Sequence, residues 1–205
     1  MRVALTFDDG PGPATPRLLD VLAAHGVRAT FFLLGENVVR SRDVAVRLAR
    51  DGHLLGNHSW SHPRPEAISA RDFAGEIRRT DALLAEIRRE AGLAPLRGAF
   101  PTRLPYGPAA DDPRLRALAA LDRTHVHWTG DFSDWVQPPP EPAALALRLR
   151  EHVTSQHLAG LPAVLDLHDS SKRFEERFAT AEAVGLFLAA GDLEIETVPG
   201  SVPSA

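Results

Sequence analysis

Two adjacent aspartates, Asp8 and Asp9, follow an apolar run near the start of the chain and stand directly before Gly10, in the stretch TFDDGPGP. Two neighbouring carboxylates repel each other in a small site unless a cation or a proton gives them different roles. The pair is therefore typical of a site in which one carboxylate holds a metal ion and the other takes up a proton. The charge of the cation would offset the repulsion between the two.

A pair of histidines, His58 and His62, adds metal-ligand chemistry in the stretch HSWSH. A spacing of four residues would place both imidazoles on one face of a helical turn. Pro63 disfavours helical geometry at His62, so the spacing predicts a single turn within a loop. The alternative is a solvated loop in which two histidines occur by chance. Two histidines and one carboxylate would form a three-ligand site with open positions, typical of catalytic zinc or a similar divalent ion.

The elements that must position these residues alternate regularly along the chain. Short apolar runs predict strands at residues 2–7, 29–35, 53–58, 97–101, 124–130, 162–169 and 193–198. Longer periodic segments predict helices at residues 15–26, 41–52, 69–92, 112–122, 143–160 and 175–191. This α/β alternation is typical of a parallel sheet with crossover helices, which either closes into a barrel or stays open. The pattern alone does not choose between the two.

Polar residues gather just after these predicted strands, where ligands bind in parallel α/β folds. They are Asp8, Asp9, His58, His62, Arg103 to Tyr106, Asp131, Asp134, Trp135, His168 and Asp169. We therefore expect them to meet at one end of the sheet. His125 and His127 fall inside a predicted strand and are interpreted as packing or surface groups, and Trp128 as a core residue. Trp60 would either stack on a substrate or cover the histidine loop.

In order along the chain, these residues resemble five motifs of the polysaccharide deacetylases of carbohydrate esterase family 4. The matching stretches are TFDDGP at 6–11, HSWSH at 58–62, RLPYG at 103–107, DFSDW at 131–135 and LDLH at 165–168. The resemblance spans residues 3 to about 198 and has no broken motif position. It implies the fold of that family, an irregular (β/α)7-type barrel with parallel strands and outer helices, which agrees with the seven predicted strands.

The resemblance also implies roles in acid–base chemistry and metal binding. Asp8 would be the general base, oriented and kept ionised by Arg103. Asp9, His58 and His62 would bind one divalent metal ion. Zinc is the default expectation, and cobalt, nickel or manganese would also suit two imidazoles and one carboxylate.

For the proton donor and the substrate pocket, the resemblance points to the later motifs. His168 would be the general acid, with Asp134 tuning the charge around it. The backbone N–H of Tyr106 would donate to the oxyanion. The residues expected to contact substrate are Pro105, Tyr106, Trp135 and Leu167, of which Trp135 and Leu167 would line a small acyl pocket.

Length and composition limit the other possibilities. The 205 residues suit one catalytic domain over residues 1–205, with 199–205 predicted to be a flexible tail. A net charge of −4 without a basic run gives no case for nucleic acid or an anionic membrane, and the absence of cysteine excludes thiolate ligands. No apolar run approaches about 20 residues and no signal pattern opens the chain. The sequence thus predicts a cytoplasmic protein, or a secreted one if a leader was removed; a monomer is the default expectation.

The functional prediction is a metal-dependent hydrolase that uses activated water to remove N-acetyl groups from an N-acetylated sugar or oligosaccharide. An O-acetyl esterase of the xylan type, or an amidase for a small acylated metabolite, would use the same residues and remains the alternative. A non-catalytic carbohydrate-binding relic would show eroded motif positions, and none is eroded. The sequence does not decide which acetylated substrate is used.

Overall fold

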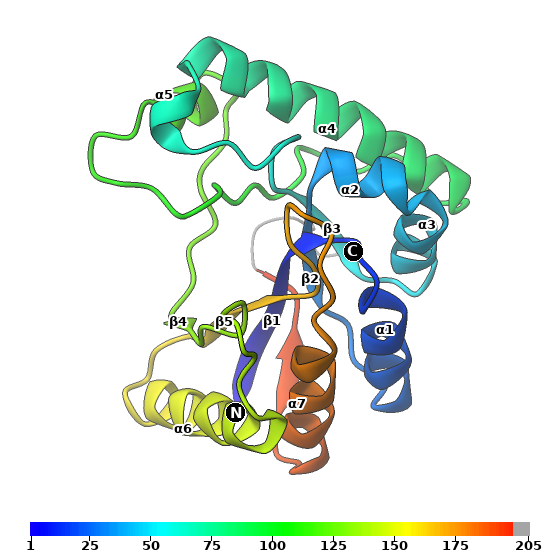
Figure 1. Ribbon diagram of the computed structural model, residues 1–205, viewed down its shortest axis with the longest axis vertical. Coiled ribbons are helices and arrows are strands. Elements are labelled where there is room, and N and C mark those ends of the chain that lie inside the picture. The colour runs from blue at the N-terminus through cyan, green and yellow to red at the C-terminus, as the bar shows by residue number, and fades with distance from the viewer. Residues whose placement is uncertain (199–205) are drawn as a thin grey trace.

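Strand β1, Arg2–Gly10, lies at the centre of a parallel sheet with the strand order β3-β2-β1-β5-β4, and β6 also pairs with β1. The other strands are β2 Thr30–Leu33, β3 Leu54–Asn57, β4 Gly130–Asp131, β5 Val164–His168 and β6 Glu194–Glu196. This computed structural model describes residues 1–198 (Figure 1), so the predicted tail at 199–205 lies outside the described residues. Every strand pair is parallel, as the alternating pattern predicts.

Single bridges and one short segment close this sheet into a ring. The end of β3 bridges to Thr102, which bridges in turn to His125. The segment that begins at His125 then changes partner. The Val126 N–H donates to the Thr102 carbonyl at 2.9 Å, and the Thr129 N–H donates to the Val164 carbonyl at 2.9 Å. Because β4 continues this segment beside β5, the strands form an irregular parallel barrel, and the predicted fold class is confirmed.

Of the seven predicted strands, one is absent, one keeps only a bridge at His125 and the first residue of β4, and one is longer than expected. Residues 97–101 form no strand, because Gly98 has a φ of 92° and Pro101 has no N–H to donate to a ladder. Residues 124–130 divide their hydrogen bonds between two partners, so the strand pairing is confined to β4. Strand β1 continues three residues beyond its predicted end, to Gly10, and so carries both aspartates within the sheet.

All six predicted helices are present, with shorter bounds. They are α1 Thr15–Ala24, α3 Arg42–Arg50, α4 Ala70–Glu90, α5 Pro113–Ala119, α6 Pro142–Leu158 and α7 Phe178–Ala189. The sequence pattern missed two short elements, α2 Gly35–Arg40 and the 3₁₀ helix η1 Pro65–Ala67. Ser69 begins α4, since its side-chain oxygen accepts the Asp72 N–H at 3.1 Å. No helix within residues 1–198 is long and apolar enough to cross a membrane.

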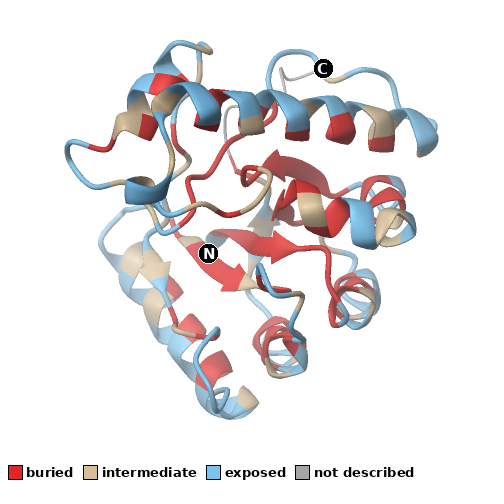
Figure 2. Cartoon of the chain, turned by 45° about the horizontal axis from the view of Figure 1, so that its top comes forward, coloured by how far each residue is buried: buried red, intermediate tan, exposed pale blue. Residues whose placement is uncertain are grey.

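Side-chain alternation along β1 and β5 gives the sheet an outer and an inner face. On the outer face, Leu5, Phe7 and Leu167 join the main core. Helices α1, α3, α6 and α7 cover this core around the sheet, whose strands β1, β2, β3 and β5 are largely buried (Figures 1 and 2). The inner face of the same two strands carries Thr6, Asp8, Asp166 and His168. One set of alternate residues therefore stabilises the fold, and the other is available for chemistry.

The Phe7 side chain gives a direct test of this outer core. Phe7 is fully buried, and its ring stacks on that of Phe31 with centroids 5.0 Å apart. Phe7→Ala is expected to lower the free energy of unfolding by ~3–5 kcal/mol, measured by urea denaturation, because it removes a large buried ring and leaves a cavity. Leu158→Ala is the matched control: Leu158 is 82% exposed, so its loss should change stability by no more than ~0.5 kcal/mol. Equal effects of the two changes would contradict the assigned core.

Candidate active site

A β-bulge explains how two adjacent aspartates reach one cavity. In the pairing with β2, Asp8 lies opposite Phe32 and Gly10 lies opposite Leu33, so Asp9 is an extra residue without a partner. Asp9 has a φ of 69°, in the left-handed region that aspartate tolerates better than most residues. Because the bulge interrupts the alternation of the strand, the Asp8 and Asp9 side chains both line the same cavity.

The two histidines converge without the helical geometry that their spacing suggested. Ser59 and His62 have φ values of 72° and 57°, and the turn is closed by the Ser59 hydroxyl, which accepts the His62 N–H at 3.2 Å. The His58 and His62 rings lie 5.2 Å apart between centroids. His58 Nδ1 lies 2.9 Å from the Arg103 carbonyl and must therefore carry the proton that it donates. His58 thus presents Nε2 to the cavity as a lone pair.

Asp9, His58 and His62 form a group that could hold a divalent ion. One ligand atom from each residue lies within 4.8 Å of the others, and Asp9 Oδ1 is 3.5 Å from His58 Nε2 and 3.2 Å from His62 Nε2. Within the described chain, the buried Asp9 Oδ1 has no hydrogen-bond partner. A buried, unpaired carboxylate oxygen between two imidazole nitrogens fits a cation, and this set of donors suits zinc or a related divalent metal.

The electrostatics of these three groups agree with that assignment. Burial, together with the repulsion that a protonated His58 would exert, lowers the pKa of His62 to about 2, and burial also lowers the pKa of His58 well below its ordinary value. Both rings are therefore neutral at physiological pH, the state that metal coordination requires. Burial raises the pKa of the Asp9 carboxyl to about 7, against the opposing charge of His168. A bound cation would reverse that shift.

Arg103 holds Asp8 from behind. Arg103 is fully buried, and its Nη1 donates to Asp8 Oδ1 at 2.9 Å and to the Thr6 hydroxyl at 2.7 Å. The same nitrogen also donates to Asp166 Oδ1 at 3.0 Å. Burial and the nearby charge of Asp8 raise the pKa of Asp166 to about 8, although Arg103 opposes this. Asp166 is not among the predicted site residues, yet the alternation in VLDLH places it on the same strand face as His168.

His168 and Asp134 form a hydrogen-bonded ion pair. His168 Nδ1 lies 2.9 Å from Asp134 Oδ1, and Asp134 Oδ2 accepts the His168 backbone N–H and the Thr180 hydroxyl, each at 2.8 Å. Burial alone would lower the pKa of His168, but the charge and hydrogen bond of Asp134 outweigh it and raise that pKa well above its ordinary value. The ring is therefore protonated at neutral pH, with Nε2 available as a donor.

Asp134→Asn is expected to lower the pKa of His168, because the largest charge opposing desolvation is removed. An NMR titration of the imidazole protons would measure this. The His168–Asp134 pair also stabilises the folded wild-type protein. This stabilisation is fully present below the unfolded-state histidine pKa of about 6.5, and it is lost as the pH rises through the raised pKa of His168 in the folded state. The exposed Asp111→Asn variant is the control and should leave the His168 titration unchanged. A His168 pKa that is the same in wild type and Asp134→Asn would contradict the pairing.

A cavity of about 560 Å³ opens over these groups. Among the residues singled out from the sequence, it is lined by Asp8, Asp9, His58, His62, His168, Tyr106 and Trp135. Arg103 and Asp134 do not line it: they lie behind Asp8 and His168 and are placed to position them. The structure therefore brings nine of the eleven predicted site residues into one cluster, on the inner face and at the carboxyl ends of the strands.

Two predicted substrate residues do not reach the cavity. Leu167 is fully buried in the outer core, because alternation along β5 turns Asp166 and His168 inward and Leu167 outward. Pro105 is also buried, and its carbonyl accepts the Arg114 guanidinium at 2.9 Å rather than facing a substrate. Both predictions followed motif positions, which do not show the direction of a side chain.

The aromatic and histidine residues outside the motifs differ in how well they were predicted. His125 is a buried packing group, as expected, and its Nδ1 accepts the Leu104 N–H at 3.1 Å. Trp60 does not line the cavity and instead stacks with the Arg79 guanidinium, 3.4 Å from the ring centroid. Trp128, expected in the core, is half-buried and lines the cavity. The aromatic surface near the site is therefore Tyr106, Trp128 and Trp135.

Asn37 at the start of α2 ties two loops of the site together. Its side-chain amide donates to the Asp9 carbonyl at 2.7 Å and to the Ser171 carbonyl at 2.9 Å. Asn37 is fully buried. Nothing in the local sequence marks it, because its two partners, Asp9 and Ser171, lie 28 and 134 residues away in the chain. Its two bonds fix the bulged backbone of Asp9 against the loop that follows β5.

Asn37→Ala is expected to weaken divalent-metal affinity by ~10–100-fold, because groups that orient a ligand contribute about this much. Competition titration against a coloured chelator would measure the affinity. Val39→Ala is the matched control, since Val39 lies on the same helix and is 57% exposed. Metal affinity equal to that of wild type in Asn37→Ala would show that Asn37 does not orient Asp9.

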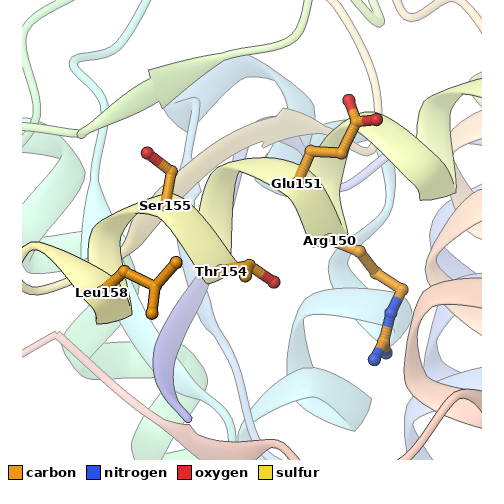
Figure 3. Close-up of a pocket in the computed structure, with 5 residues that line it drawn as sticks. All are labelled: Arg150, Glu151, Thr154, Ser155 and Leu158. Atoms are coloured by element: carbon orange, nitrogen blue, oxygen red, sulfur yellow. The ribbon is translucent and has the colours of Figure 1, made fainter.

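A second hollow, of about 460 Å³, lies on the outer helix α6 (Figure 3). All its lining side chains come from that one helix: Arg150, Glu151, Thr154, Ser155 and Leu158. It shares no residue with the cavity above the aspartates and holds none of the motif residues. The motif residues that line a cavity therefore lie at the barrel end that carries Asp8 and Asp9.

Comparison with known proteins identifies a family model and several relatives that match this chain. The family model described as polysaccharide deacetylase matches residues 1–125. A peptidoglycan-N-acetylglucosamine deacetylase of Bacillus cereus (strain ATCC 14579) is 40% identical over 134 residues, 65% of this chain and 46% of that protein. A chitooligosaccharide deacetylase of Bradyrhizobium sp. (strain ANU 289) is 34% identical over 181 residues, 87% of this chain and 75% of that protein.

The solved structures agree with the sequence comparison. A family 4 carbohydrate esterase from Streptomyces lividans, in complex with acetate, superimposes with a TM-score of 0.71 at 27% identity, covering 94% of this chain and 90% of that one. The chain spans between about a third and a half of the length of the first curated relatives it matches. By the match to its family model, by its relatives and by its fold, this chain belongs to the polysaccharide deacetylase family.

Proposed function

We propose that this chain is a metal-dependent hydrolase that removes acetyl groups from an N-acetylated sugar or oligosaccharide. The observation that carries the proposal is the convergence of Asp9, His58 and His62, with Asp8 and His168 lining the same cavity. This arrangement supplies a metal site, a carboxylate base and a protonated imidazole in one place. Amide hydrolysis needs all three, because an N-acetyl group is a poor electrophile with a poor leaving group.

The proposed metal is a divalent ion held by Asp9, His58 and His62, with zinc expected first and cobalt, nickel or manganese as alternatives. When bound, such an ion would act as a Lewis acid that polarises the acetyl carbonyl and lowers the pKa of the attacking water towards ~7. Three protein ligands leave open positions at a catalytic site, whereas a structural zinc takes four.

Asp8 is the proposed general base. Arg103 engages Asp8 Oδ1, so Oδ2 is left to accept the proton of the attacking water. The backbone N–H of Tyr106, in a residue held at a φ of 63°, is the proposed donor to the oxyanion, and such a donor contributes ~3–4 kcal/mol. Arg103 acts by positioning the base and has no contact with the cavity in this scheme.

His168 is the proposed general acid. Its Nε2 protonates the amine nitrogen as the C–N bond breaks, and Asp134 stabilises the imidazolium beforehand. Water thus adds its oxygen to the acetyl carbon and passes one proton to Asp8, while the amine leaves with the proton from His168. The second proton of the water stays on the acetic acid, which ionises to acetate, and the proton on Asp8 returns to His168 through solvent before the next turnover. No step requires a covalent intermediate with the protein.

The experiment that tests the proposal is acetate release from a panel of acetylated substrates. The panel contains chitin oligomers, peptidoglycan fragments, small N-acetyl glycosides and acetylxylan, each with metal-loaded protein and with chelator. Acetate from the N-acetyl substrates, lost with chelator and restored by metal, is the expected result. Release from acetylxylan alone would assign the O-acetyl esterase instead. No acetate from any substrate with metal-loaded protein would refute a deacetylase.

A further inference from the structure

Three cationic side chains surround one side of the cavity mouth. Arg64 follows the histidine motif, whereas Lys172 and Arg173 follow β5, and all three are exposed and line the cavity. None of them lies within ion-pair distance of a carboxylate in the described residues 1–198. Lys172 is the single lysine of a chain whose net charge is −4. The cations at this mouth therefore contrast with the negative net charge of the chain.

Tyr106 holds two of these cations in place beside the metal ligands. Lys172 Nζ donates to the Tyr106 hydroxyl at 2.8 Å, and the Arg64 guanidinium lies 4.9 Å from the centroid of the same ring. The edge of the Tyr106 ring packs on His62, with centroids 4.4 Å apart. Two separate loops thus bring positive charge to Tyr106, which packs directly against a proposed ligand of the metal.

Two carboxylates near the mouth also line the cavity, but neither forms an ion pair with these three cations within residues 1–198. Glu175 lines the cavity, but its Oε2 accepts the Arg177 guanidinium at 3.2 Å. Asp131 also lines it, comes from β4, and accepts the Ser133 N–H at 2.8 Å. The buried carboxylates on the cavity floor face Arg103 and the proposed metal. The side of the mouth next to Tyr106 is left with unneutralised positive charge.

We infer that Arg64, Lys172 and Arg173 form a subsite for an anionic group, a carboxylate or a phosphate, carried by the acetylated saccharide. This inference rests on the proposed function and narrows its substrate class to acidic saccharides. Single exposed cations contribute little in water, but a cluster at a cavity mouth raises the local concentration of an oppositely charged substrate and speeds its capture. The effect should therefore appear in KM more than in kcat.

The test compares saccharides that differ in one charge. The neutral member is an N-acetylglucosamine oligomer, and the acidic members are the same oligomer bearing a carboxylate or a phosphate on the neighbouring sugar. Wild-type protein should show a kcat/KM about tenfold higher for an acidic member, through KM, with the gap closing at high salt. Comparison of the carboxylate-bearing oligomer with the phosphate-bearing one shows which anion the subsite binds.

Variants connect this preference to the named residues. In Lys172→Gln/Arg173→Gln, the ratio of kcat/KM between acidic and neutral saccharides should fall towards one, and Lys172→Arg should keep the wild-type ratio. Arg148 is an exposed arginine on α6. Arg148→Gln is therefore the matched control and should leave kcat/KM unchanged for both saccharides. A wild-type ratio of one, or equal losses on both substrates in the double variant, would overturn the subsite.

A binding measurement separates this inference from the proposed activity. Because the chain has one lysine, an amine-reactive label can modify only Lys172 and the N-terminal amine, which serves as the internal reference. The acidic saccharide should protect Lys172 from the label, and the neutral one should not. Protection without any acetate release would keep the anion subsite and reject the deacetylase. Acetate release without protection would keep the deacetylase and reject the subsite.

Discussion

Asp9→Asn and His62→Gln proteins are expected to bind no divalent ion after dialysis and to lose acetate release by about 10³-fold or more. The three donor atoms lie within 4.8 Å of one another, so each variant leaves only two of them. Loss of the ion removes both the activation of water and the polarisation of the carbonyl, and one such electrostatic contribution alone accounts for ~10²–10³ in rate. Elemental analysis gives the metal content per chain, and the acetate assay gives the rate.

Controls must separate metal loss from unfolding. A ligand that binds only the folded state raises the melting temperature, so metal should stabilise wild type but not the two variants. His157→Gln changes an exposed histidine of α6 and should keep both the metal and the activity. Full metal content in Asp9→Asn together with wild-type turnover would remove Asp9 from the site.

His168→Gln is expected to lower acetate release from an N-acetyl amide by ~10²–10⁴-fold. The amine is a poor leaving group and needs the proton that the imidazolium supplies, and the pair with Asp134 keeps the ring charged. An aryl acetate ester releases a phenolate that departs without protonation. The same variant should therefore lose much less activity on that ester.

The ratio of the two losses is the informative measurement. Wild type and His168→Gln are assayed on the amide and on the ester at the same pH and metal concentration. A large loss on the amide with a small loss on the ester identifies a proton donor to the leaving group. Equal losses would show that His168 instead contributes to metal binding or to a step common to both substrates.

Much of the fold could be predicted from local sequence pattern. Strand alternation and helical periodicity depend on neighbouring residues, so the six helices and the central strands could be predicted from the chain alone. The segments at 97–101 and 124–130 could not, because a strand exists only where a partner pairs with it. Pairing here is limited to a bridge at Thr102 and a change of partner after Val126.

The residue types of the site were likewise available from the sequence, but their directions were not. Asp8 and Asp9 share a cavity because a bulge at a φ of 69° breaks the strand alternation. The same alternation, intact on β5, turns Leu167 into the core and Asp166 towards Arg103. A motif position therefore predicted which residues belong to the region, and the backbone geometry decided which of them face it.

By itself, the sequence determined the α/β class, the residues proposed as ligands and as acid and base, and their place after the strands. Only the tertiary structure decided that Asn37 fastens the Asp9 bulge and that Arg64 and Lys172 meet at Tyr106. The physical reason is the range of the interactions. Periodicity and turn preference act over a few residues, whereas these contacts join loops that are far apart in the chain and become neighbours only when the barrel closes.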